Sequence, residues 1–397
     1  MQTKLVLLGT GTPNACPNAN GPSSAVVVGD RAYLVDFGPG VVRQASAAYF
    51  NGVDALRPDL LTVAFCTHLH TDHTAGYPDL IFTPWVLERP VPLKVFGPKG
   101  LQHMTDHILQ AYETDIDFRI HGFEKANESG YRVEVTEIES GIVYRDDLVT
   151  VEAFPVSHGT LECYGYKFTT PDRTIVITGD TAPLDLVAEK SKGCDILLHE
   201  VEYAAGISCR EPKWQKYHRE VHTLSTDLAG VAKKANPKLL VTYHRIYHMN
   251  VQDNHKNLAA EMAWRDTAIL DEIRDAGYDG YVVNGKDLDV FKYGQRTNSG
   301  LRIGTLPRSF WDEPGDAFYF HLPDWQILPY SALFQTVFSL TLTSSERIII
   351  VLQLWQNSRI FCCLSLQEPD PQTACTVCLS FAFQKGCFIW QLLLRNP

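Results

Sequence analysis

Three histidines and one aspartate crowd into six residues of this 397-residue chain, in the stretch THLHTDHTAG. Side chains two residues apart in an extended segment project to the same side, so His68 and His70 can hold one metal ion together. A turn into a helix-like segment beginning near Thr74 would bring Asp72 and His73 to a second ion beside the first. Imidazole and carboxylate ligands suit zinc, and also iron or manganese.

Three later residues of ligand type each stand where an apolar run stops. They are His158 in VEAFPVSHG, Asp180 in TIVITGD and His244 in LLVTYHR. This placement predicts that the three side chains lie along one rim of the sheets. His248 and His255 are nearby alternatives to His244, which we favour because it directly follows its run.

Short apolar β-rich runs alternate with amphipathic helical runs from Lys4 to about Tyr293. The expected strands are Leu5–Leu8, Ser24–Val28, Ala32–Asp36, Leu61–Cys66, Leu93–Phe96, Leu148–Phe154, Tyr164–Phe168, Thr174–Thr178, Ile196–Leu198, Leu239–Tyr243 and Gly280–Val283. The expected helices are Val41–Phe50, Leu101–Tyr112, Asp185–Lys190, Thr226–Ala235 and Asn257–Ala276. This pattern indicates an α/β fold in which sheets pack face to face under covering helices.

Composition limits the class of protein. With 45% hydrophobic and 20% charged residues, the chain is typical of a soluble globular protein. Its net charge of −11 argues against a protein that coats nucleic acid, although it does not exclude a local basic groove. The run Leu5–Leu8 is too short for a signal-peptide core. We therefore expect a cytoplasmic protein whose ten cysteines need not form disulfides.

The character of the amino-acid sequence changes after about Gly294. We expect a hydrolase domain over residues 1–293 and a C-terminal tail, 294–397, that is accessory or poorly ordered. A membrane-spanning helix is disfavoured there because Glu346 and Arg347 split the apolar run. A zinc site is a weaker alternative, since paired C-x-x-C motifs are absent; its cysteines would be Cys362, Cys363, Cys375, Cys378 and Cys387.

The order of the motifs resembles the metallo-β-lactamase-fold hydrolases. LLGTGTP is similar to their first strand and turn, HLHTDH to their signature, and VSH, TGD and TYH to their later motifs, over about residues 1–293. The resemblance implies a four-layer αβ/βα sandwich with the site at one edge of two sheets. It also implies two divalent metal ions, expected to be Zn²⁺ with iron or manganese as alternatives, which lie about 3.5–4 Å apart and share a hydroxide.

The resemblance assigns the ligands by position. His68, His70 and His158 would hold one ion, Asp72, His73 and His244 would hold the other, and Asp180 would bridge the two. Within the superfamily the closer likeness is to the ribonuclease Z group and to arylsulfatase-like members. That likeness implies that Glu200 in LLHEVEY and His222 in VHTLSTDLAGVA protonate the leaving group, and that they act with Asp72 as catalytic residues. His199 is expected to be structural.

The chain departs from the ribonuclease Z pattern in two places. Thr71 stands where that group usually has Gly, and only 21 residues, GTLECYGYKFTTPDRTIVITG, separate His158 from Asp180, where that group carries a tRNA-binding arm. With the acidic charge, this disfavours tRNA and favours a small ester or phosphodiester substrate. Tyr77, Phe82 and Trp85 would line an aromatic pocket or pack in the core.

The expected activity is that of a di-metal hydrolase acting through a metal-bridging hydroxide on a phosphodiester or related ester. The first alternative is an arylsulfatase-like or lactone hydrolase on the same site. The second is a non-catalytic member that uses the fold for binding. We expect no membrane partner, and the resemblance is compatible with a homodimer.

Overall fold

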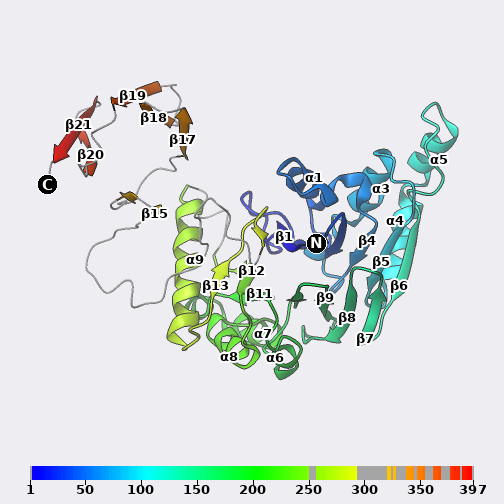
Figure 1. Cartoon of the computed structure of the whole chain (residues 1–397). Helices are drawn as coiled ribbons and strands as arrows, with labels where there is room; N and C mark the ends of the chain where they lie inside the picture. Colours follow the sequence, from blue (N-terminus) through cyan, green and yellow to red (C-terminus); the bar gives the residue numbers. More distant parts are fainter. Residues whose placement is uncertain are drawn as a thin grey trace. The chain divides into compact units, whose positions relative to one another are not determined.

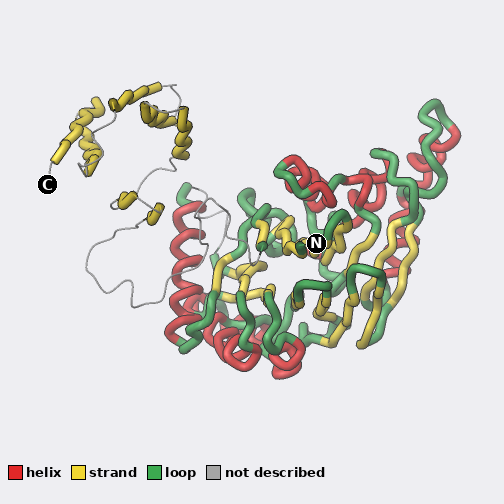
Figure 2. The backbone as a smooth tube through the Cα atoms, in the orientation of Figure 1, coloured by secondary structure: helices red, strands yellow, loops and turns green. Residues whose placement is uncertain are grey.

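The computed structural model describes residues 2–249 and 256–292 with their side chains, and beyond them the backbone of short strands between Phe320 and Arg395. The chain divides into two compact units, Met1–Asp312 and Glu313–Pro397. The first unit contains two seven-stranded sheets together with the helices that cover them (Figures 1 and 2).

The first sheet has the strand order β14-β1-β2-β3-β4-β5-β6. Its members are β1 (Thr3–Gly9), β2 (Ser23–Val28), β3 (Arg31–Val35), β4 (Val63–Phe65), β5 (Leu93–Gly97), β6 (Val133–Glu137) and β14 (Val290–Phe291). Strands β3 to β6 run parallel. Their carboxyl ends therefore meet at one edge of the sheet, where the loop after β4 carries the histidine motif.

The second sheet has the order β13-β12-β11-β10-β9-β8-β7. Its members are β7 (Gly141–Arg145), β8 (Thr150–Pro155), β9 (Tyr164–Thr169), β10 (Thr174–Ile177), β11 (Ile196–Glu202), β12 (Leu240–Ile246) and β13 (Val282–Asn284). Strands β10 to β13 are parallel, and β7 to β10 form an antiparallel meander. The expected strands Leu148–Phe154 and Tyr164–Phe168 are thus confirmed as β8 and β9.

Both faces of the first sheet are buried, as β1 shows. Leu5 and Leu7 join the core between the two sheets, whereas Val6 and Leu8 join the core under the helices. Because side chains alternate between the faces of a strand, a strand covered on both sides reads as a continuous apolar run. LVLL has that pattern.

Helices complete the outer layers. The first sheet is covered by α1 (Val41–Phe50), α3 (Tyr77–Val86) and α4 (Leu101–Ala111), and the second by α6 (Asp185–Lys190), α8 (Ser225–Ala235) and α9 (Leu258–Asp275). The predicted four-layer αβ/βα sandwich is therefore confirmed. The remaining helices are α2 (Thr71–Thr74), α5 (Glu113–His121), α7 (Pro212–Val221) and the 3₁₀ turns Asp54–Leu56, Pro58–Leu60 and Ala205–Cys209.

The predicted strands and helices of this unit are present, with ends displaced by a few residues at most sites. The helix-like segment expected from near Thr74 corresponds to α3, which begins at Tyr77, whereas α5 and α7 have no counterpart among the predicted helices. Helix α7 reads PKWQKYHREV, and only its last residue, Val221, is buried. With so few apolar residues, it lacks the periodic stripe by which an amphipathic helix is recognised.

In the second unit, backbone strands occur in the segment where the sequence shows no clear strand periodicity. They are β15 (Phe320–Leu322), β16 (Trp325–Ile327), β17 (Val337–Thr343), β18 (Arg347–Gln353), β19 (Phe361–Gln367), β20 (Thr376–Gln384) and β21 (Cys387–Arg395). Of the suggested zinc cysteines, Cys375 lies outside the described residues, and the side chains of the others are not described. Among the described helices, none has the length and apolar character needed to cross a bilayer.

Candidate active site

Three histidine nitrogens converge from the two sheets. His68, in the loop after β4, is fully buried, and its Nε2 lies 3.0 Å from Nδ1 of His70. His158 lies beyond the end of β8 at Pro155, in the turn that pairs it with Leu161, rather than at the strand end as predicted. Its Nε2 lies 3.2 Å from the same His70 nitrogen. The first predicted ligand group is therefore assembled.

A second group forms beside it. Helix α2 begins at Thr71, so Asp72 and His73 belong to its first turn, not to a bend that precedes a helix near Thr74. Asp72 Oδ2 lies 3.1 Å from His244 Nε2 and 3.5 Å from His73 Nε2. The short helix places Asp72 and His73 beside His244, as the predicted second group requires, while the His73 ring stays 4.2 Å from the ring of His68.

A β-bulge directs His244 into the site. The sequence analysis places this residue directly after a strand, but it lies inside β12. Tyr243 pairs with Glu200 and Arg245 pairs with Val201, so His244 is the extra residue between two pairs. Its φ of 43° is in the left-handed region, which non-glycine residues rarely adopt. Bulges of this kind re-aim a side chain and are common beside active sites.

Asp180 lies between the two groups. Its Oδ1 is 3.4 Å from His73 Nε2, and its Oδ2 is 3.4 Å from His244 Nε2 and 3.9 Å from His158 Nε2. The strand before it, β10, ends at Ile177, so Asp180 belongs to the following loop. The carboxylate is buried and contacts a histidine of each group, which is the position of a bridging ligand.

The hydrogen bonds of the histidines test whether metal ions fit here. His158 Nδ1 donates to the carbonyl of Val221 at 2.7 Å, and His73 Nδ1 donates to Asp36 at 2.8 Å. In the neutral imidazoles, the Nε2 lone pairs then point into the site toward carboxylate oxygens. Among the seven candidate ligands, the buried atoms that make no hydrogen bond are His73 Nε2, Asp180 Oδ1 and His244 Nδ1. Lone pairs facing carboxylates repel, so a cation between them fits this arrangement.

Asp36 supports the site, and the sequence analysis missed this role. It accepts hydrogen bonds from His73 Nδ1 and from the backbone N–H and the hydroxyl of Thr67. A carboxylate behind a metal-binding histidine fixes its tautomer and its orientation. The signal lies in LVDFGPG, where an aspartate follows an apolar run as Asp180 does, although the pattern there predicts only the end of a strand.

Glu200 and His222 form a buried pair at the rim of the histidine groups. Glu200 lies within β11, not after it as predicted, and its Oε1 is 2.9 Å from His222 Nδ1. The backbone N–H of Thr181 also donates to this oxygen. The His222 ring centroid lies 4.9 Å from that of His158 and 6.0 Å from that of His244.

The charge of this pair determines where its proton resides. Burial lowers the pKa of His222, but the carboxylate of Glu200 raises it to about 9. Burial also raises the pKa of Glu200, while the charge of His222 lowers it. An imidazolium held by a carboxylate at Nδ1 carries a second proton on Nε2. That proton can be donated to a leaving group, which is the chemistry of a general acid.

Of the two alternatives for Tyr77, Phe82 and Trp85, the structure confirms packing in the core and not an aromatic pocket. Tyr77, Phe82 and Trp85 lie on α3 and are buried in the core beneath it. The ring of Tyr77 stacks on Phe37 with centroids 4.4 Å apart, and Trp85 Nε1 donates to the carbonyl of Asn127. These aromatic side chains hold α3 against the first sheet and offer no surface to a ligand.

The other histidines have different positions. His199 is buried and its Nδ1 donates to the carbonyl of Glu200, which agrees with a structural role. His248 lies beyond β12 with Glu202, outside the two groups, and His255 lies outside the described residues. Of the three histidines considered at this end of β12, His244 is the one placed in the site.

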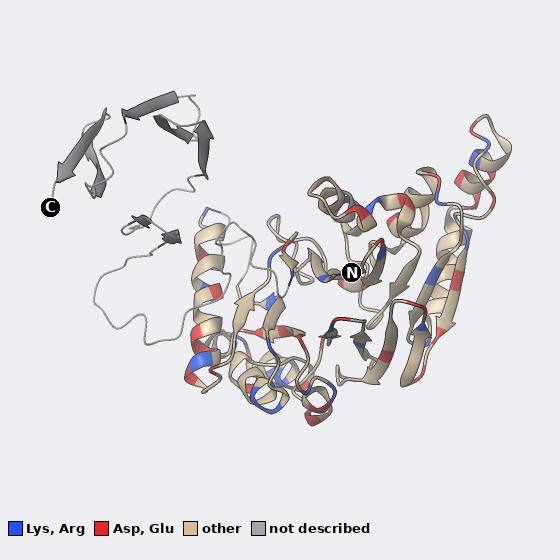
Figure 3. Ribbon diagram, in the orientation of Figure 1, with Lys and Arg blue, Asp and Glu red and all other residues tan. Residues whose placement is uncertain are grey.

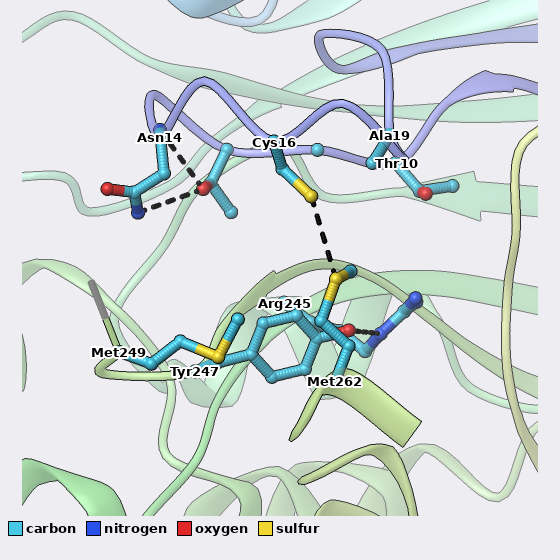
Figure 4. Close-up of a pocket in the computed structure, with 10 residues that line it drawn as sticks. Thr10, Asn14, Cys16, Ala19, Arg245, Tyr247, Met249 and Met262 are labelled. Carbon is cyan, nitrogen blue, oxygen red and sulfur yellow. Dashed lines mark hydrogen bonds between the residues drawn. The ribbon is translucent and has the colours of Figure 1, made fainter. Parts of the chain in front are cut away.

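A separate small cavity lies between the loop after β1 and the end of β12. Its lining includes Thr10, Cys16, Tyr247 and Met262, and Cys16 Sγ lies 3.5 Å from Met262 Sδ (Figure 4). The cavity volume is about 30 Å³. A space of this size holds roughly one water molecule, so it is not a substrate pocket.

Comparison with known proteins places this geometry in a family. A sequence model of the beta-lactamase superfamily domain matches residues 31–245. The chain is 32% identical over 248 residues to ribonuclease Z of Mycobacterium bovis (strain BCG / Pasteur 1173P2), covering 61% of this chain and 86% of the relative. It is 28% identical over 277 residues to ribonuclease Z of Mycolicibacterium gilvum (strain PYR-GCK), covering 68% of this chain and 94% of that relative.

Solved structures share the fold. The metallo-beta-lactamase fold protein YhfI from Bacillus subtilis matches with a TM-score of 0.52 and 19% identity, over 74% of this chain and 100% of that protein. The short form of human tRNase Z matches with a TM-score of 0.53 and 20% identity, over the same shares. At this identity the two structures establish the fold alone.

Proposed function

The chain belongs to the beta-lactamase superfamily, among the ribonuclease Z-like proteins, and from that membership we propose that it hydrolyses phosphodiester bonds with two divalent metal ions. One observation carries the proposal. Seven side chains of ligand type from two sheets converge in a buried site, where His73 Nε2 and Asp180 Oδ1 lie 3.4 Å apart without a hydrogen bond.

The distances support two ligand sets. His68, His70 and His158 would hold one ion, and Asp72, His73 and His244 would hold the other. Asp180 would bridge them, because its two oxygens approach histidines of both groups. Imidazole and carboxylate ligands favour Zn²⁺, and iron or manganese accept the same set.

The protein's own groups divide the remaining work. When bound, the two ions supply Lewis-acid chemistry, which makes water a better nucleophile near neutral pH and stabilises developing negative charge. Asp72, from the first sheet, and Asp180, from the second, orient the ligand groups of the site. Glu200 holds His222 at Nδ1, which leaves the proton on Nε2 for the departing oxygen.

Two classes of substrate are considered, RNA and a small phosphodiester. The relatives named ribonuclease Z favour RNA, which the sequence analysis disfavours. The link between His158 and Asp180 favours a small diester, because it consists of β9, β10 and short turns, with no inserted arm. On α9, acidic and basic residues are interspersed rather than sorted into a basic face (Figure 3).

A substrate panel tests the proposal. Purified, zinc-loaded protein would be assayed on bis-p-nitrophenyl phosphate, p-nitrophenyl sulfate, a lactone and a precursor tRNA. We expect turnover of a phosphodiester, and the ratio of small diester to precursor tRNA identifies the substrate class. Turnover of only the sulfate or the lactone would reject the assignment. Protein without tight stoichiometric metal would identify a non-catalytic binding member of the fold.

A further inference from the structure

A second cluster of histidine and glutamate lies next to the active site and shares no residue with it. Glu202 is the last residue of β11, His218 lies on α7, and His248 follows the end of β12. Glu202 Oε1 is 3.2 Å from His218 Nδ1 and 2.5 Å from His248 Nε2. These three residues, the Glu202 cluster, bring one carboxylate and two imidazoles to a point.

The polar atoms of the Glu202 cluster are buried and lack hydrogen bonds. Glu202 has no exposed surface, and neither of its carboxylate oxygens accepts a hydrogen bond from the described residues. His218 Nδ1 and His248 Nε2 are also buried without a hydrogen-bond partner. A buried carboxylate is costly unless its charge is compensated. The three side chains therefore offer unsatisfied ligand atoms, and an ion would hold His248 Nε2 farther from Glu202 Oε1, since two ligands of one tetrahedral zinc ion lie roughly 3 Å apart.

We propose that Glu202, His218 and His248 form a third divalent-metal site, separate from the two-metal site. Two imidazoles and one carboxylate match the ligands of zinc sites that keep a fourth position for water. The ligand atoms lie within 4.8 Å of one another. The His218 side chain is 16% exposed, so a path for the ion exists from the α7 side.

The protonation state of His218 suits a metal ligand, whereas His248 can coordinate an ion only in one tautomer. Burial lowers the pKa of His218 to about 4, although Glu202 raises it, so its imidazole is neutral at pH 7. His248 Nδ1 lies 3.2 Å from Arg210 Nε and accepts its hydrogen bond. Coordination through His248 Nε2 requires the proton on Nδ1, so the exposed Arg210 side chain must turn away when the ion binds.

The position of the Glu202 cluster indicates its role. Glu200 and Glu202 are two residues apart on β11, and His218 and His222 are four apart at the end of α7, so each glutamate faces one histidine. The ring centroids of His218 and His222 are 5.7 Å apart. An ion in the Glu202 cluster would tie α7 to β11 and β12, and it would thereby position His222 for the reaction.

Zinc titration of the full-length protein tests the site. Metal-free wild type would be compared with Glu202→Gln and His218→Asn, and with His121→Asn as a control on an exposed histidine of α5. We expect the first two variants to bind one equivalent of Zn²⁺ fewer than wild type and the control to lose none. Equal stoichiometry in all four proteins would overturn the proposal, whatever number of ions the two-metal site holds.

Two further measurements keep the result independent of folding and of the active site. Anomalous scattering from zinc-soaked wild-type crystals should show a peak between the three side chains, and a hydrogen-bonded cluster without a peak would overturn the proposal. The same peak should persist in Asp180→Asn, whose ligand belongs to the other site. Arg210→Met should bind the third ion more tightly, because it removes a positive charge and the donor that opposes the required tautomer; weaker binding would contradict the ligand assignment.

Discussion

At the scale of single residues, Asp180 links the two histidine groups. Replacing it with Ala should release or scramble the metal ions and abolish turnover, because its two oxygens contact histidines of both groups. Metal content by mass spectrometry and turnover of bis-p-nitrophenyl phosphate measure the two effects. Asp117→Ala, on the exposed face of α5, should change neither. Two retained metals with full activity in Asp180→Ala would remove Asp180 from the site.

His222 is the residue expected to protonate the leaving group. His222→Ala should keep the two active-site metals, since two coordination shells are complete without it. Removing a general acid costs roughly 10²–10⁴ in rate, and most for a poor leaving group. We therefore expect a strong loss on an alkyl phosphodiester and a much smaller loss on a p-nitrophenyl ester. Equal losses on both would indicate electrostatic stabilisation, and loss of an active-site metal would make His222 a ligand.

The pH dependence of the same step follows from the raised pKa of His222. Its acid form is present below the pKa and is lost above it. Glu200 raises this pKa to about 9 against the effect of burial. Metal cations bound in the site lower the pKa of His222 again. Turnover of an alkyl diester should therefore decline as the pH rises, with a midpoint below about pH 9. Glu200→Gln removes the carboxylate charge and should move the fall to still lower pH. Identical profiles of kcat against pH for wild type and variant would contradict the pairing.

At the scale of elements, the segment that carries Asp72 is held by close contact with the backbone at Gly38. A Cβ at Gly38 would lie 2.5 Å from the carbonyl oxygen of Asp72 and 2.4 Å from backbone carbon of Gly21. Gly38→Ala should therefore lower the free energy of unfolding and weaken metal binding. Gly230, within α8, has open space around its Cβ position, and Gly230→Ala should stabilise the protein by about 0.5–1 kcal/mol. Urea unfolding measures both; a Gly38→Ala protein as stable as wild type would contradict the packing.

Elements with a strong local signal could be predicted from the sequence, and those set by tertiary contacts could not. Apolar runs such as Thr174–Ile177 predict buried strands, and the spacing of histidines and aspartate in the loop after β4 predicts a metal site. The bulge at His244 depends on how β12 pairs with β11, which no local pattern encodes. Helix α7 is polar along most of its length, so the position of His218 beside Glu202 becomes visible only once the helix is packed.

At the scale of the whole molecule, charge and topology bear on the substrate. The net charge of −11 disfavours a general nucleic-acid surface, and the short link from His158 to Asp180 contains only β9, β10 and turns. Both features were available from the sequence. The similarity to ribonuclease Z points the other way. Turnover measured on both substrate classes decides between a small diester and RNA, because the same two-metal chemistry can hydrolyse the phosphodiester bond of either.

The extent of the catalytic unit yields the last prediction. Deleting residues 294–397 should leave metal content and turnover intact, because β14 still pairs Phe291 with Leu5 of β1. Deleting residues 286–397 is the matched control. It also removes β14 and Asp287, whose carboxylate accepts hydrogen bonds from Thr10 and Asn20, so this shorter chain should be less stable. Metal analysis and thermal unfolding compare the two chains with the full-length protein. An insoluble or metal-free product of the first deletion would show that the tail belongs to the folded core of the enzyme.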